Sequence, residues 1–75
     1  MWVKLADGPV FNAASARAIK VGPAGSAEGN WAIIAEMPNG EEIALAEYHL
    51  PQTAQASHEI IVENLKLGMR FMELE

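Results

Sequence analysis

The sequence predicts an α+β domain, an antiparallel β-meander of four or five strands with one C-terminal α-helix packed on one face. Three observations point to this class. An Asn-Gly pair at residues 39–40 separates two strand-like runs, and after Pro51 the spacing of apolar residues changes from two to that of a helix. The chain has 75 residues, which is enough for one small domain.

The boundaries of the expected domain follow from the same patterns. Residues 1–72 should form a single compact domain, with a flexible loop at 22–30 and a helix over about 51–67. Residues 73–75 are expected to be a tail. The Leu74-Glu75 dipeptide in it resembles the scar of a cloning site, so the prediction gives it no part in the fold.

The first expected element is a hairpin. Residues 2–5 and 10–12 read as strands on either side of an Asp-Gly-Pro sequence at 7–9. This sequence favours a turn because Asp and Gly accept the bend and Pro ends the preceding strand. Residues 12–15 should then form a short corner.

A third strand should run over residues 16–21, where Ile19 and Val21 point to the core and Lys20 faces water. The Gly-rich segment 22–30 follows it and has no apolar period, as in a flexible connector. It does not match a phosphate-binding P-loop, because no Lys follows the glycines and the next element is a strand.

A second hairpin is expected over residues 31–48, around a two-residue Asn39-Gly40 turn. In this register Ile34 lies opposite Leu45, and the hairpin has two apolar faces. The first face carries Ile34, Ile43 and Leu45, and the second carries Trp31, Ile33, Ala35, Ala44, Ala46 and Tyr48. The second face is rich in alanine, so we expect the helix to pack closely on it.

The helix should begin near Pro51, since proline fits a first helical position, and should end at Gly68. The stripe expected to lie on the sheet consists of Ala54, His58, Ile61 and Leu65. A second apolar strip lies elsewhere on the helix and consists of Ala56, Ile60 and Leu67. One small sheet cannot easily cover both.

The chain therefore has apolar surface in excess, and this predicts self-association, as a dimer. The candidate interface combines the second helix strip with the segment after Gly68: Ile60, Leu67, Met69, Phe71 and Met72. An interaction site would most naturally be built from the aromatic residues Trp2, Trp31, Tyr48 and Phe71. Trp31 and Tyr48 are expected to border the core under the helix.

Composition excludes several classes of function. The chain has no cysteine, which rules out disulfides, thiolate zinc sites and cysteine nucleophiles. A formal net charge of −5 disfavours nucleic-acid binding. No secretory signal is visible, and no apolar run approaches the ~18 residues of a membrane span. We therefore expect a cytoplasmic protein that binds neither nucleic acid nor membrane.

The residues do not suggest catalysis. His58-Glu59 begins like a zinc-protease HExxH motif, but Val62 stands where the second histidine is needed. The serines lack a nucleophile motif, and the carboxylates are expected on solvated faces. The prediction is a protein that is not an enzyme and needs no metal or cofactor, with His58 at the helix–sheet contact.

The predicted order of elements resembles that of small flagellar proteins of the FlbD type, and its strands and terminal helix resemble the carbon-storage RNA-binding regulators. No motif carries either resemblance, so no residue role is transferred. The favoured hypothesis is a non-catalytic protein–protein interaction module that self-associates or binds an unidentified protein partner. The alternative is a small-ligand or nucleotide-binding domain that uses loop 22–30.

Overall fold

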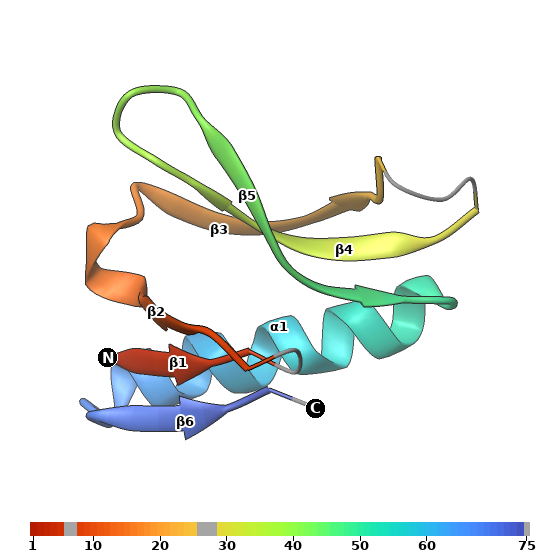
Figure 1. Ribbon diagram of the computed structural model, residues 1–75. Coiled ribbons are helices and arrows are strands. Elements are labelled where there is room, and N and C mark those ends of the chain that lie inside the picture. The colour runs from red at the N-terminus through yellow and green to blue at the C-terminus, as the bar shows by residue number, and fades with distance from the viewer. Residues whose placement is uncertain (6–7, 26–28, 75) are drawn as a thin grey trace.

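The computed structural model describes residues 1–5, 8–25 and 29–74, and it contains six strands, one α-helix and one short 3-10 helix (Figure 1). In chain order the elements are β1 (Trp2–Lys4), β2 (Val10–Asn12), η1 (Ala13–Ser15), β3 (Ala18–Pro23), β4 (Trp31–Glu36), β5 (Glu42–Tyr48), α1 (Pro51–Lys66) and β6 (Phe71–Glu73). The strands form two three-stranded sheets, in the orders β2-β1-β6 and β3-β4-β5. The predicted α+β class is confirmed. The strands form two sheets, however, and not the single antiparallel meander that the sequence predicted.

The first sheet contains the predicted hairpin. β1 and β2 pair antiparallel, with Val3 opposite Phe11; of the predicted turn, residues 6 and 7 lie outside the described residues. β6 pairs with the other edge of β1 in parallel, with Val3 beside Met72. Because side chains alternate along a strand, Val3 is fully buried while Trp2 is exposed.

The C-terminal segment is part of this sheet. The Leu74 N–H donates to the Lys4 carbonyl at 2.8 Å, and the Leu74 side chain is only 4% exposed within the core cluster. The prediction that residues 73–75 form a tail is thus wrong for Glu73, which ends β6, and for Leu74. A strand of three residues shows no recognisable period, and its pairing with β1 could not be read locally.

The corner after β2 forms as predicted. Asn12 caps η1, because its Oδ1 atom accepts a hydrogen bond from the Ala14 N–H at 3.1 Å. The next strand, β3, begins two residues later than expected, since the corner extends beyond Ser15. Ile19 and Val21 are half-buried and Lys20 is exposed, as the alternation predicted.

The turn between β4 and β5 differs from the predicted two-residue turn. The Met37 N–H donates to the Glu41 carbonyl at 2.7 Å, and the Gly40 N–H donates to the Met37 carbonyl at 2.9 Å. These bonds enclose three residues, of which only Gly40 has a positive φ, +89°. This is a type I turn followed by a left-handed glycine, and Pro38 occupies the position that proline favours in it.

The additional turn residue shifts the register by one. Ile34 pairs with Ala44 instead of Leu45, and a bulge at Leu45 then restores the predicted pairing of Ile33 with Ala46. The bulge also turns Leu45 toward the core, where it is 4% exposed, and Ile43 packs against the same core. The predicted apolar face of Ile34, Ile43 and Leu45 is therefore wrong.

Gly40→Ala should lower the free energy of unfolding by about 1–2 kcal/mol, because an L-residue is strained in the left-handed conformation. The space around Gly40 is open, so the effect comes from the backbone alone. Gly25→Ala is the matched control, since Gly25 has equally open surroundings and no positive φ. Urea unfolding followed by circular dichroism measures both; equal stabilities would contradict the three-residue turn.

Helix α1 ends at a glycine, as predicted. Gly68 has a φ of +72°, the Met69 N–H donates to the Asn64 carbonyl at 3.1 Å, and the Gly68 N–H donates to the Leu65 carbonyl at 3.2 Å. These two bonds form a Schellman motif, which reverses the chain direction at the helix end. The motif thereby directs the chain back into β6.

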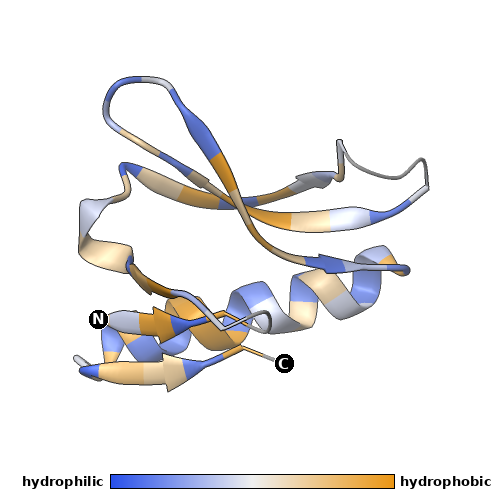
Figure 2. Ribbon diagram, viewed as in Figure 1, coloured by the Kyte–Doolittle hydropathy of each residue, from blue (hydrophilic) through white to orange (hydrophobic). Residues whose placement is uncertain are grey.

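The helix buries Ala54 and Ile61 completely and His58 in part. Leu65, predicted to continue this stripe, is 41% exposed, and Asn64 is half-buried in its place. Both sheets and the helix contribute to one core, and the hydrophobic residues of β1, β4 and α1 stand out in Figure 2. Its buried members are Val3, Ala13, Ile33, Ala35, Leu45, Ile61 and Leu74.

Candidate functional site

The main candidate is an exposed apolar surface around β6 and the end of α1. Four of the five predicted interface residues are exposed there, with Leu67 at 68%, Ile60 at 55%, Phe71 at 51% and Met69 at 47%. The Schellman turn at Gly68 places Leu67 and Met69 just before β6. We use "apolar surface" for the exposed apolar side chains around β6: Trp2 and Phe71 on the outer face of the sheet, Ile60 on its helix side, and Leu67 and Met69 in the turn.

Met72, the fifth predicted residue, lies on the other side of β6. It is half-buried and packs against the core, and its Sδ atom accepts a hydrogen bond from Asn64 Nδ2 at 3.4 Å. Phe71 and Met72 point to opposite faces because they are successive residues of a strand. The sequence did not predict the strand, so it could not separate these two residues.

Trp2 completes the apolar surface. It is 51% exposed and is the register partner of Phe71 in the parallel β1–β6 pair, so the two aromatic side chains are neighbours on the outer face of the sheet. The sequence identified each as a candidate but not their adjacency, because they stand near opposite ends of the chain. Neighbouring exposed aromatic residues are typical of the centre of a binding surface.

A small pocket adjoins β6 on its helix side. Its volume is about 150 Å³, and its walls are formed by Ser57, Ile60, Met72, Glu73 and Leu74. Pockets that bind drug-sized ligands are typically about 300–1,000 Å³. This pocket is of a size to take a side chain from a partner.

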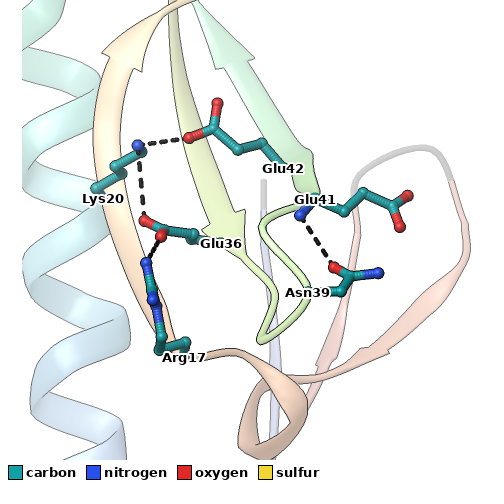
Figure 3. Close-up of polar contacts among 6 residues, drawn as sticks. All are labelled: Arg17, Lys20, Glu36, Asn39, Glu41 and Glu42. Atoms are coloured by element: carbon teal, nitrogen blue, oxygen red, sulfur yellow. Dashed lines mark hydrogen bonds and ion pairs between the residues drawn. The ribbon is translucent and has the colours of Figure 1, made fainter.

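A polar cluster lies on the outer face of the second sheet (Figure 3). Arg17 forms an ion pair with Glu36, and the Lys20 Nζ atom lies 3.8 Å from Glu36 and 2.5 Å from Glu42. Glu36 is the most enclosed of the four, with a side chain 20% exposed. Each cation faces a carboxylate, and such surface pairs contribute about 0–1 kcal/mol to stability. Pairing of β3, β4 and β5 brings these side chains together, so the cluster needs no ligand to explain it.

A second polar group anchors the loop before β4. Asn30 Nδ2 donates to Glu47 at 2.9 Å, and Asn30 Oδ1 lies 3.1 Å from His49 Nδ1. The Ala24 N–H also donates to the Asn30 carbonyl at 2.9 Å, which joins the two ends of the loop. Residues 26–28, the centre of the proposed ligand loop, lie outside the described residues.

His58 has a structural contact. It is half-buried, and its Nε2 atom donates to the Ile19 carbonyl at 2.8 Å, which confirms the predicted place at the helix–sheet boundary. Tyr48 also packs against the core, as expected. In the described part of the chain, no three or more His, Asp or Glu side chains come together to hold a metal ion.

Comparison of the chain with protein-family models, curated proteins and solved structures gives no match. Within the ranges that the structure describes, no helix is both long and apolar enough to span a bilayer. Among the residues that the structure describes, no buried side-chain nitrogen or oxygen atom lacks a hydrogen-bond partner. Among the described residues, the apolar surface gathers five of the exposed large apolar side chains that the fold of a single chain leaves uncovered.

Proposed function

We propose that this protein is a small, non-catalytic interaction module that self-associates as a dimer through its apolar surface. The observation that carries the proposal is the position of Trp2 beside Phe71, each about half exposed, with Met69 and Leu67 in the adjoining turn. Large apolar side chains gathered on one surface mark contacts with other molecules. Phe71, on the edge strand, is the anchor we expect, with Trp2 beside it on β1.

A second copy of the chain is the partner we favour. A dimer about a two-fold axis buries the same surface on both copies, so a single kind of contact would cover the Phe71 side chain of each copy. A chain of 75 residues has a small core and benefits from burying more apolar area in a dimer. Its net charge of −5 disfavours nucleic acid and anionic membranes as partners.

The non-catalytic part of the proposal is supported by how the ionisable side chains are used. His58 is engaged with a backbone carbonyl, while Arg17, Lys20 and Glu36 hold neighbouring strands together. Catalytic acids and bases need a cleft in which they face a substrate. The pocket beside β6 contains Ser57 and Glu73, but its size fits a side chain better than a substrate. A wider, open hollow of about 390 Å³ along α1 is lined by His58, Glu59 and Glu63 among others, and the Nε2 atom of that His58 is already engaged by the Ile19 carbonyl.

Sedimentation velocity over a micromolar dilution series tests the proposal. The protein should form dimers, and Phe71→Ser should raise the dissociation constant by at least about tenfold, which corresponds to ~1.4 kcal/mol. Leu50→Ser is the control, since Leu50 is 57% exposed at the opposite end of α1. A monomer at every concentration, or equal effects of the two variants, would refute self-association through this surface.

A further inference from the structure

We infer that the second copy docks along the free edge of β6, pairing that strand antiparallel with its own counterpart about a two-fold axis at Met72. The two β2-β1-β6 sheets would then join into one sheet of six strands. This inference rests on the proposed self-association and specifies its geometry. It assigns a role to backbone groups as well as to the apolar side chains.

β6 is an edge strand with unpaired backbone groups. The Arg70 carbonyl accepts from the Trp2 N–H, and the Leu74 N–H donates to the Lys4 carbonyl, both at 2.8 Å. In a parallel ladder alternate residues bond to the same neighbour, so Phe71 and Glu73 direct their N–H and C=O groups away from β1. Within the described residues, nothing pairs with these groups on the free side.

The second sheet protects its edges in ways that β6 does not. On β3, the His58 side chain donates a hydrogen bond to the Ile19 carbonyl, so that carbonyl is not free, and Lys20 places a charge on the strand. On β5, Glu42 and Glu47 provide negative charge along the strand. Charges and covered backbone groups are the usual means of preventing edge-to-edge pairing. β6 carries one charge, and Lys4 lies 3.9 Å from that carboxylate.

Hydrogen bonding and charge select one register. With the axis at Met72, Phe71 lies opposite Glu73 of the second copy, and all four outward N–H groups find a carbonyl. Moving the axis to Glu73 would place two carboxylates directly opposite each other, which is unfavourable. Moving the axis to Phe71 would place Glu73 opposite Met69 of the second copy. The Met69 N–H would then have to bond to the Glu73 carbonyl, but it already donates to the Asn64 carbonyl.

The same arrangement also brings the exposed Ile60 side chain to the second copy. On the outer face, side chains from the two copies form one row across the joined strands. In order they are Trp2 and Phe71 of one copy, then Glu73 and Lys4 of the second copy. The Lys4–Glu73 ion pair is therefore kept within each copy. On the inner face, both helices lie on one side of the joined sheet. Ile60 and the pocket of about 150 Å³ beside it then face the second copy, whose Ile60 is of a size to enter it.

Single-cysteine variants test the register, because the natural chain contains no cysteine. In the proposed dimer Met72 lies opposite itself in a non-hydrogen-bonded pair, where Cα atoms are about 4.5 Å apart, within disulfide range. Met72→Cys should therefore become a disulfide-linked dimer on mild oxidation. Glu73→Cys, whose counterparts would be about 7–8 Å apart, and Glu59→Cys on the helix should stay unlinked.

Glu73→Pro tests the edge itself. It removes an outward N–H without removing a bond to β1, so the variant should remain folded but sediment as a monomer. Glu73→Ala removes the same carboxylate and keeps the N–H, and it should still dimerise. Circular dichroism and urea unfolding confirm that each variant is folded.

The outcomes separate this geometry from self-association in general. Linking of Glu73→Cys in place of Met72→Cys, or a Met72→Cys dimer that does not link, would overturn the register. Dimers of Glu73→Pro as strong as those of Glu73→Ala would overturn edge pairing while leaving self-association intact. A monomeric natural chain would overturn both proposals and leave the edge to an extended segment of a different protein.

Discussion

Ile61→Ala is expected to lower the free energy of unfolding by about 3 kcal/mol, within the range of about 2–5 kcal/mol for such core truncations. Ile61 is fully buried and belongs to a core shared with Val3 of the first sheet and Ile33 of the second. Its removal leaves a cavity where the helix meets both sheets. A domain of this length has roughly 4–11 kcal/mol of stability in total, so the loss is a large fraction of it.

Urea unfolding at equilibrium, followed by circular dichroism of α1, measures this effect. Leu65→Ala is the control, because Leu65 lies one turn later on the same helix and is 41% exposed. Its loss should be about 1 kcal/mol or less. The sequence pattern alone placed both residues on the buried stripe, so equal losses would favour the pattern over the observed orientation of the helix.

Features encoded by neighbouring residues were predicted well from the sequence. The hairpin of β1 and β2, the corner capped by Asn12 and the helix from Pro51 with its stop at Gly68 all have local signals. Each signal reflects a backbone requirement, such as a cap for a free N–H or a glycine at positive φ. Such requirements act over a few residues and can be read from them.

Features that depend on distant pairing could not be read in this way. β6 has three residues, and its partner β1 stands at the other end of the chain, so neither periodicity nor spacing reveals the pair. The bulge at Leu45 likewise compensates for the three-residue turn at a distance along the hairpin. The three-residue turn shifts the pairing by one residue, and the bulge shifts it back. The predicted register was therefore wrong for Ile34, which lies between the turn and the bulge, and correct for Ile33, which lies beyond the bulge.

The candidate surface shows the same division. Exposure of Ile60, Leu67, Met69 and Phe71 follows from a surplus of apolar residues, which composition and helical spacing reveal. The adjacency of Trp2 and Phe71, and the inward position of Met72, follow from the parallel β1–β6 pair. A surplus of apolar residues can therefore be predicted from the sequence, whereas the shape of the surface requires the fold.

Leu74→Ala is the second change with a large expected effect, a loss of about 2–4 kcal/mol. Leu74 is 4% exposed and lies in the core with Val3 and Ile61, so its truncation opens a cavity under the first sheet. Its N–H bond to Lys4 also holds the end of β6 in register, and a loosened side chain weakens that bond. Leu50→Ala is the control, since Leu50 is 57% exposed and should change stability by about 0.5 kcal/mol or less.

Because Leu74 also borders the pocket beside β6, both variants are best compared in a Phe71→Ser background and at a protein concentration far below its dissociation constant, where the proposed dimer contributes nothing to stability. Urea unfolding of the monomer then reports the core contact alone. If Leu74→Ala and Leu50→Ala unfold at the same urea concentration, the C-terminal strand is not docked on β1 in solution. The edge proposed for dimerisation would then not exist, and pairing with β1 would no longer hold Phe71 and Met72 on opposite faces of a strand.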